Sequence, residues 1–312
     1  MDPWTQFWKQ GHSNTFGDYY RDGYQGAVKN WWSEVCTSIA PGATVLELCC
    51  GNAALLPGLL SAGIEATYLG VDIAEVAIPD GIVPDIEKSP VTAKLISNTR
   101  LESLPPSLAD VDLAVSVFGM EYSDLTKSLS EIYRILKENG RLEAVLHHSG
   151  SIVSKMSQRA LEEFNLEDLE VTWDHLSTIN EALEGAPTPK ALKFNRKAEK
   201  ARKKINALCD KYMRDTNLKT GNAFMFEQMS HALKFFKLIQ ANTGERKLFL
   251  QELKLEALAS KARHQQMVSV ALDSQQIEVL KDNLLGVGFL QVACEALLQG
   301  DEVLGWKVSA LN

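Results

Sequence analysis

The sequence predicts an α/β fold in which a doubly wound, mostly parallel sheet is interrupted by an inserted all-α subdomain. Two apolar runs of strand length are each tipped by a carboxylate, Glu47 in the first and Asp72 after the second. Strand-like runs then disappear between Ser151 and Gln266, where apolar residues recur at helical spacing. Strand-like runs return only in the last residues of the chain. These three observations indicate one sheet formed by both ends of the sequence.

The first two runs enclose a loop of small residues and a short helical stretch. The loop follows Leu48 and reads Cys-Cys-Gly-Asn-Ala-Ala, and the helical stretch covers 55–62. Small residues let a ligand lie directly over the backbone where the strand turns into the helix. A carboxylate after the second strand can accept both hydroxyls of a ribose. This is the pattern of the opening βαβ unit of a nucleotide-binding sheet.

Glu47 helps to choose between two classes of cofactor. A dinucleotide brings a pyrophosphate to the helix N-terminus, and a nearby carboxylate would repel it. S-adenosylmethionine brings an ammonium and a sulfonium, which a carboxylate attracts. The segment resembles the first motif of the class I S-adenosylmethionine-dependent methyltransferases, an acid followed by alternating glycines. Cys49 and Ala53 stand at the outer two glycine positions, and Gly51 keeps the central one.

Three further strands are expected before the insertion, at 94–97, 112–119 and 142–146. The stretch 100–105 is similar to the family segment that flanks the adenine, with Arg100 in the position of the acid and Leu101 as the apolar neighbour. Apolar residues at helical spacing predict a helix over 125–136, begun by Asp124 and closed by Gly140. Pro79, Pro84 and Pro90 limit any helix after the second strand to a short piece.

Residues 151–266 are expected to form a helical insertion, with helices over 154–169, 171–183, 190–214, 223–241 and 245–270. Within it, the segment 190–204 carries eight basic residues against one acid. A solvated helix face, a site for RNA or an acidic partner, and an oligomer contact are all compatible with that segment.

The end of the chain is expected to form a helix over 275–285 capped by Ser274, a strand to about Leu297, a turn at 299–301 and a last strand over 303–311. This segment resembles the close of class I methyltransferases, in which the seventh strand runs antiparallel between the fifth and sixth. The resemblance implies a seven-stranded Rossmann-like doubly wound sheet with an antiparallel terminal strand. It divides the chain into a methyltransferase core over 41–150 and 267–312 and the insertion 151–266, a substrate cap or dimer contact.

Residues 1–40 are dense in aromatic side chains and include a helix expected from about Gly26 to Ile39. Such rings can pack this helix against the sheet, or part of the segment can lie over the cofactor as a lid. Small-molecule methyltransferases often use an N-terminal segment in this way. The candidates to face the pocket are His12, Tyr20 and Tyr24.

The resemblance also implies the residues of the site. The expected cofactor-binding residues are Glu47, Cys49, Gly51, Asn52, Asp72, Ile73, Leu101 and Phe118. The candidates for a general base follow the fourth and fifth strands, where ligands of open α/β sheets bind; they are Glu121, Tyr122, His147 and His148. Strand alternation turns the two adjacent histidines to opposite faces, so at most one is expected to reach the pocket. Nothing in their spacing indicates a metal site.

Composition bounds the remaining possibilities. The 312 residues carry a net charge of -8, which argues against nucleic acid or a membrane surface as a partner of the chain as a whole. The five cysteines are scattered and lack metal-type spacing, which is typical of a reducing compartment. No run approaches the roughly 20 apolar residues that a membrane span needs. A cytoplasmic, soluble protein is expected.

The leading hypothesis is a methyltransferase that transfers a methyl group from S-adenosylmethionine to a small molecule by in-line displacement. A second possibility is an RNA or protein methyltransferase that presents its substrate with the basic segment 190–204. An NAD-dependent oxidoreductase and a non-catalytic S-adenosylmethionine-binding protein are also compatible with the sequence. The expected partners are a small-molecule methyl acceptor and a second copy of the chain.

Overall fold

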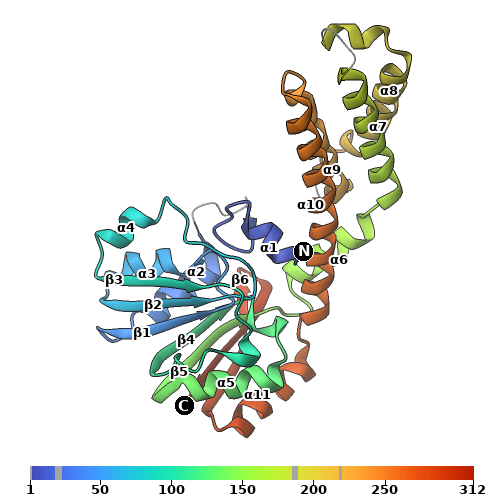
Figure 1. Ribbon diagram of the computed structural model, residues 1–312. Coiled ribbons are helices and arrows are strands. Elements are labelled where there is room, and N and C mark those ends of the chain that lie inside the picture. Colours follow the sequence, from blue (N-terminus) through green and yellow to red (C-terminus); the bar gives the residue numbers. More distant parts are fainter. Residues whose placement is uncertain (1, 18–22, 185–188, 218–219) are drawn as a thin grey trace. The chain divides into compact units, whose positions relative to one another are not determined.

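A computed structural model describes residues 2–17, 23–184, 189–217 and 220–312 (Figure 1). The chain divides into two compact units. The sheet unit comprises Met1–Met156 with Gln266–Asn312, and the helical unit comprises Ser157–Gln265.

The sheet unit contains one seven-stranded sheet in the order β3-β2-β1-β4-β5-β7-β6 (Figure 1). Strands β1 to β5 run parallel, and β7 runs antiparallel to both of its neighbours, β5 and β6. This arrangement confirms the predicted fold class. The strands are β1 (Ala43–Leu48), β2 (Ala66–Val71), β3 (Val91–Ile96), β4 (Val111–Val117), β5 (Leu136–Leu146), β6 (Leu290–Gln299) and β7 (Glu302–Leu311).

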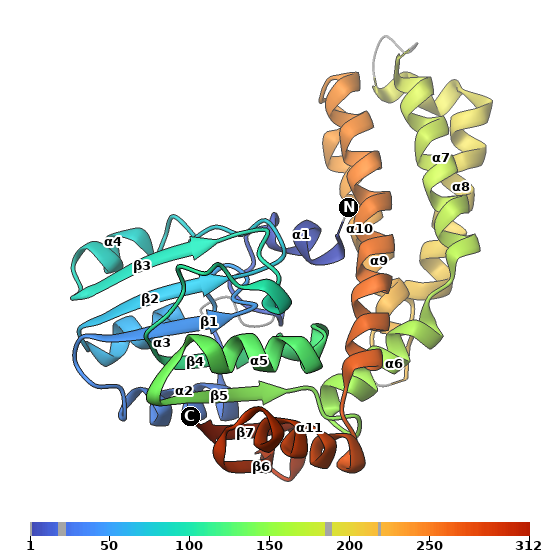
Figure 2. The same cartoon turned by 60° about the horizontal axis from the view of Figure 1, so that its bottom comes forward.

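Helices cover both faces of the sheet (Figure 2). The pair α2 (Gly26–Cys36) and α3 (Leu56–Ala62) packs on one face, and the pair α5 (Leu125–Ile135) and α11 (Ser274–Val287) packs on the other. Strand alternation divides β1 between the two cores, because Val45 belongs to the first and Leu46 to the second. The sheet is therefore buried on both sides, as parallel sheets require.

Two expected helix ends in the sheet unit are wrong. Helix α5 ends at Ile135 and the chain enters β5 directly at Leu136, so Gly140 lies within the strand and does not close the helix. Helix α11 is capped by Asp273, whose side chain accepts from the backbone amides of Gln275 and Gln276. Ser274 is the first helical residue. A capping box with Gln276 explains why the aspartate takes the capping position.

The remaining elements of the sheet unit are short. Helix α1 (Pro3–Trp8) begins the described chain, and α4 (Val83–Glu87) has only five residues, as the prolines predict. Helix α2 ends at Cys36, three residues before the expected end. The 3-10 turns η2 (Leu101–Ser103) and η3 (Met120–Tyr122) follow β3 and β4.

The helical unit is formed by helices with a core of their own, in which Leu176, Met225, Met229 and Phe235 are fully buried. Three stretches expected as single helices are broken. The stretch 154–169 is divided between α6 and α7, which are separated at residues 164–165. A 3-10 turn (η4) precedes Asn195, which caps α8, and a second 3-10 turn (η5) follows α9. The elements are α6 (Ile152–Glu163), α7 (Leu166–Glu184), η4 (Pro189–Phe194), α8 (Arg196–Met213), α9 (Ala223–Leu233), η5 (Lys234–Leu238) and α10 (Thr243–Val270). Residues 152–156 of α6 and 266–270 of α10 belong to the sheet unit.

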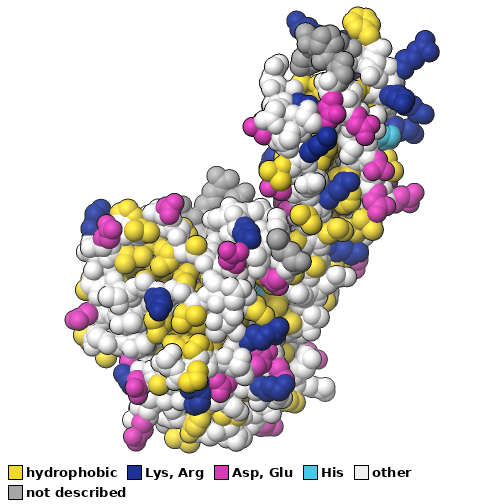
Figure 3. Space-filling model, in the orientation of Figure 1, with side chains coloured by type: hydrophobic (Ala, Val, Ile, Leu, Met, Phe, Trp, Pro, Cys, Tyr) yellow, Lys and Arg dark blue, Asp and Glu magenta, His cyan; other side chains and the backbone are white. Residues whose placement is uncertain are grey.

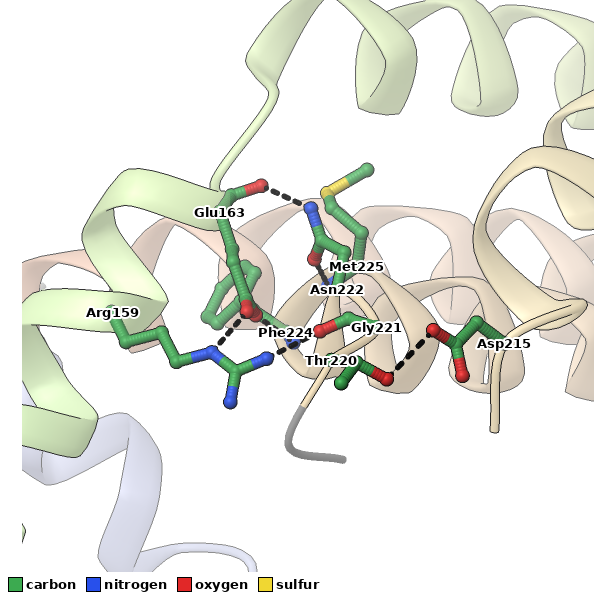
Figure 4. Close-up of polar contacts among 8 residues, drawn as sticks. All are labelled: Arg159, Glu163, Asp215, Thr220, Gly221, Asn222, Phe224 and Met225. Carbon is green, nitrogen blue, oxygen red and sulfur yellow. Dashed lines mark hydrogen bonds and ion pairs between the residues drawn. The ribbon is translucent and has the colours of Figure 1, made fainter. Parts of the chain in front are cut away.

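The end of α6 is bound to the start of α9 by a set of polar contacts (Figure 4). The carboxylate of Glu163 accepts from Nε of Arg159 at 2.6 Å and from the backbone amide of Phe224 at 2.8 Å. The side chain of Asn222 donates to the Glu163 carbonyl at 2.9 Å and accepts from the Met225 amide at 2.8 Å. One asparagine thus caps α9 and joins it to α6.

Among the residues that the structure describes, no helix is both long and apolar enough to span a bilayer.

Candidate functional site

The loop between β1 and α3 has a left-handed backbone at every second residue. Cys49, Gly51 and Ala53 have φ angles of 52, 51 and 65°. These are the positions at which the resembling family has alternating glycines. Only glycine adopts this conformation without strain, and a Cβ adds roughly 1–2 kcal/mol. The loop therefore keeps the backbone path of the glycine motif although two of its three residues are not glycine.

Helix α1 packs directly on this loop. A Cβ placed on Gly51 would lie 2.3 Å from the ring of Trp8, so only glycine allows the indole to approach so closely. Trp8 is buried. The side-chain amide of Asn52 donates to the carbonyls of Trp8 and His12, both at 2.9 Å, and accepts from the amide of Ala77 at 3.1 Å. Asn52, expected to bind the cofactor, here holds the N-terminal segment against the loop.

Glu47 lies in the core rather than at a free surface. Its Oε2 atom accepts from the Leu55 amide at 3.1 Å and from the hydroxyl of Tyr68. Burial raises the pKa of Glu47 to about 8, and the two hydrogen bonds oppose that shift. The carboxyl group therefore retains its proton at neutral pH in this state of the protein.

Asp72 follows β2 and accepts two backbone hydrogen bonds. Its Oδ2 atom accepts from the Gly51 amide and its Oδ1 atom from the Ala74 amide, each at 2.8 Å. Burial raises the pKa of Asp72 to about 6, and these hydrogen bonds oppose the shift. At neutral pH the carboxylate is ionised and directly bonded to the glycine of the loop.

A small cavity lies where β1, β2 and β4 end. Its volume is about 60 Å³, which is enough for about two water molecules. The described residues that line it combine four aromatic rings with one carboxylate and include no Lys or Arg. They are Trp4, Trp8, Thr15, Cys49, Asp72, Ile73, Phe118, Gly119 and Tyr122.

A second cavity of about 730 Å³ shares Ile73 with the first. It lies beside the segment that follows β3, and Arg100, Glu102 and Glu131 contribute charged groups to its lining. Leu101, expected beside the adenine, is instead buried in the core beneath and lines neither cavity. Its neighbour Arg100 faces the space.

Tyr122, His147 and Glu121 meet at the ends of β4 and β5. The hydroxyl of Tyr122 lies 3.1 Å from Nε2 of His147, whose ring stacks on Phe118 at 4.6 Å. The backbone amide of His147 donates to Oε1 of Glu121 at 2.8 Å. Among the described residues, Oε2 of Glu121 and Nδ1 of His147 have no hydrogen-bond partner although both are buried.

Burial separates the proton affinities of these groups. It lowers the pKa of His147 to about 3 and raises that of Glu121 to about 7. It also raises the pKa of Tyr122 well above its ordinary value. Glu121 is thus the group of the three that exchanges a proton near neutral pH.

The other predicted residues lie apart from the cavity. His148 stacks on Trp306 at 4.4 Å, and its Nδ1 accepts from the Gly150 amide. His12 stacks on Phe7 at 4.3 Å, and the buried Tyr24 shares a hydrogen bond with Thr15. Tyr20 lies outside the described residues. The structure therefore brings Cys49, Asp72, Ile73, Phe118 and Tyr122 to the small cavity.

Four lining residues were missed in the sequence. One is Gly119, which directly follows the predicted Phe118. The other three, Trp4, Trp8 and Thr15, come from the N-terminal segment, where aromatic residues are so frequent that composition does not single out any one ring. Helix α1 has only six residues, too few for a periodicity that would identify its packed face. Among the described residues, no group of His, Cys, Asp and Glu could hold a metal ion.

Residues 45–140 match the family model described as "Methyltransferase domain". No curated protein matches the chain. Among solved structures, the CMeT domain of the citrinin polyketide synthase is 11% identical and covers 91% of this chain and 51% of its own, with a TM-score of 0.43. A second similar structure is geranyl diphosphate C-methyltransferase from Streptomyces coelicolor A3(2), solved with Mg2+, geranyl diphosphate and S-adenosyl-L-homocysteine. It is 18% identical, the match covers 38% of this chain and 45% of that one, and the TM-score is 0.31.

The chain spans less than two thirds of the length of these solved proteins. The ligands named for them belong to them. The matched segment 45–140 includes β1 from Val45, all of β2, the left-handed loop between them, and β4, which ends at Val117. Over this segment, 96 of the 312 residues, the chain is therefore similar to a methyltransferase domain.

Proposed function

We propose that this protein binds S-adenosylmethionine at the ends of β1, β2 and β4 and transfers its methyl group to a small molecule. The observation that carries the proposal is the lining of the small cavity, which joins the loop, Asp72 and the end of β4. Aromatic faces and a carboxylate attract a sulfonium and an ammonium. The same lining residues, none of them Lys or Arg in the described chain, give nothing that would neutralise the pyrophosphate of a dinucleotide.

The volume of the cavity gives helix α1 a role as a lid. Binding sites for ligands as large as S-adenosylmethionine have volumes of roughly 300–1,000 Å³. The cavity lined by Trp4 and Trp8 has a volume of only about 60 Å³. The cofactor therefore enters only when α1 leaves Gly51, and Asn52 is the residue that holds the closed position. Because Ile73 lines both cavities, an elongated ligand could extend from Tyr122 past Ile73 toward Arg100.

The lid also supports a small acceptor. In the closed state, side chains of the N-terminal segment cover the cavity and would stand between the surface of a macromolecular acceptor and the reacting atoms. Alignment of the nucleophile and the methyl group in such a dry site can lower the activation barrier by on the order of 7–11 kcal/mol. We also propose that the helical unit serves as a substrate cap or a dimer contact. We further propose that the protein works in a reducing, cytoplasmic compartment.

Where the methyl acceptor must lose a proton, Glu121 is the proposed base; it lines neither cavity in this structure, but the next residue, Tyr122, lines the small one. Its pKa of about 7 suits a base at neutral pH, whereas His147, with a pKa of about 3, is a neutral partner of Tyr122. Tyr122 lines the cavity and is held in position by His147.

Titration calorimetry with S-adenosylhomocysteine tests the proposal. We expect binding in the micromolar range and none for NADH under the same conditions. Absence of heat at millimolar S-adenosylhomocysteine would overturn it. Labelled methyl incorporation from a metabolite extract, compared with RNA and protein fractions, then identifies the class of acceptor.

A further inference from the structure

The two units of the molecule carry opposite net charges. The helical unit has 19 Lys and Arg against 15 Asp and Glu, and the sheet unit has 13 against 25. The net charge of -8 for the whole chain conceals this division. Asymmetry of this kind indicates a local polyanion site in an otherwise acidic protein.

The positive charge is concentrated on one face of α8. Arg196, Lys200 and Lys203 follow one another at helical spacing, and Lys197 and Lys204 lie one residue further along, so that all five share one face. All five are exposed. We call them the basic stripe. With a rise of about 1.5 Å per residue, the stripe is roughly 12 Å long. Figure 3 shows Lys and Arg side chains gathered at the end of the helical unit where α8 begins.

The acid nearest to the stripe in the sequence pairs elsewhere. The one acid of the segment, Glu199, forms its ion pair with Arg202 at 2.7 Å, and Arg202 lies off the stripe. Lys203 of the stripe acts on Glu199 only as a neighbouring charge, which helps to lower the pKa of that carboxyl. Within the described ranges, no carboxylate forms an ion pair with any of the five cations of the stripe. A solvated face on an ordinary helix usually mixes both signs of charge. The stripe instead presents a run of positive charge.

An aromatic ring lies immediately before the stripe. Phe194 is 88% exposed and precedes the capping residue Asn195 by one position. An exposed phenylalanine beside cations can stack on an unpaired base while the cations contact phosphates.

Other polyanionic partners fit this surface less well. Insertion into a membrane surface needs an exposed apolar helix face, but the face of α8 that carries Ala198, Ala201 and Ile205 is buried in the helical unit. Protein interfaces have apolar centres from which lysine is depleted, and four of the five cations here are lysines. Phosphates accept the point charge of lysine readily.

We propose that the basic stripe together with Phe194 binds single-stranded nucleic acid. Phosphates lie along the stripe and an unstacked base lies on the Phe194 ring. This surface is separate from the methyl-transfer site, and the proposal does not depend on the methyl acceptor. RNA and single-stranded DNA present the same phosphates and bases, so both are compared in the test.

The full-length protein is titrated into fluorescein-labelled single strands of RNA and DNA of about 20 nucleotides, and anisotropy is followed from 50 to 300 mM KCl. Each phosphate that is neutralised contributes about -0.7 to the slope of log K against log salt. We expect a slope of about -3.5 for the five cations of the wild type. The double variant Lys200→Gln/Lys203→Gln is expected to reduce the slope by about 1.4 and to weaken binding at 50 mM on the order of 10-fold.

The matched control is Lys234→Gln/Lys237→Gln, which removes the same charge from exposed lysines of the helical unit outside the stripe; it should change binding less than two-fold. Phe194→Ala should weaken binding to single strands roughly 5- to 150-fold and leave duplex binding unchanged. No binding at 50 mM KCl, an equal loss in the control variant, or equal competition by polyglutamate or anionic phosphatidylserine vesicles would overturn the proposal.

Discussion

The two units place their charges in opposite ways. In the sheet unit, Glu47, Asp72 and Glu121 are buried and their pKa values are raised by burial. In the helical unit, the cations of α8 are exposed, and within the described residues those of the stripe lack carboxylate partners. A buried acid acts at short range on a ligand that replaces water, whereas exposed cations act at long range and are screened by salt. The proposed cofactor site is thus suited to a small cation and the proposed stripe site to a long anion.

The largest expected effect is a loss of stability in one unit that leaves the other unit unchanged, because each unit has its own core. Phe235 is fully buried in the helical unit, and Phe235→Ala should destabilise that unit by about 3–5 kcal/mol. Because the units have separate cores, the affinity of the sheet unit for S-adenosylhomocysteine should stay within two-fold. Hydrogen exchange of both units, followed by calorimetry, measures this. Equal loss of protection in both units would show that they unfold as one.

The units should also respond differently to pH. The folded pKa of Glu47, about 8, lies above its ordinary value, so its contribution to stability is complete below about pH 4.5 and is lost as pH rises to 8. His264 of the helical unit has a pKa lowered by burial to about 4, so its contribution is complete above pH 6.5.

Between pH 6.5 and 8 we therefore expect the sheet unit to lose on the order of 2 kcal/mol and the helical unit to change little. Hydrogen exchange at the two pH values checks this, with Glu47→Gln as the control that reduces the loss; the part that remains is expected from Glu121, whose pKa is about 7. A sheet unit that gained stability over this interval would contradict the pKa assigned to Glu47.

The lid should limit the rate at which the cofactor enters. Trp8→Ala removes the ring that contacts Gly51, so we expect the association rate of S-adenosylhomocysteine to rise on the order of 10-fold in stopped-flow fluorescence. Lys9→Ala removes only an exposed ion pair with Glu75, next to the same helix, and should have little effect. A slower association in Trp8→Ala would show that the indole helps to form the open site.

The smallest expected effect is in the loop. Ala53 has a φ angle of 65°, and Ala53→Gly should stabilise the sheet unit by about 0.5–1 kcal/mol because glycine removes strain. Ala54→Gly serves as the control, since no left-handed backbone angle occurs at that residue; it should destabilise or have no effect. Thermal unfolding of the wild type and the two variants measures this. A higher melting temperature for Ala53→Gly alone indicates relief of strain, whereas a lower one for both variants indicates that the added glycine mainly makes the unfolded chain more flexible.

The sequence predicted the sheet well because its strands are apolar runs with clear ends. The order of the strands followed from the resemblance of both chain ends, and the position of Asp72 followed from the end of β2. Local rules failed where two residues compete for one role. Asp273 and Ser274 can both cap α11, and only the reciprocal bond with Gln276 selects the aspartate.

The contact between the N-terminal segment and the loop after β1 could not be predicted in the same way. It depends on Trp8 meeting Gly51 across more than forty residues of chain and on Asn52 bonding to two carbonyls of the N-terminal segment. Leu101 was expected to line the cofactor site, but its apolar side chain is buried in the core. Its neighbour Arg100 lines the larger cavity instead. Side-chain direction at a turn is set by packing that spacing alone does not reveal.

The most direct test is calorimetry of S-adenosylhomocysteine binding to the wild type, Asp72→Ala and Asp112→Asn. Asp112 lies near the start of β4, at the opposite end of the sheet strands, and pairs with Lys137. We expect Asp72→Ala to weaken binding roughly 10- to 150-fold, the loss of one or more hydrogen bonds to a charged group, and Asp112→Asn to leave it unchanged. Unaltered affinity in a folded Asp72→Ala protein would contradict a cofactor site at the ends of β1, β2 and β4.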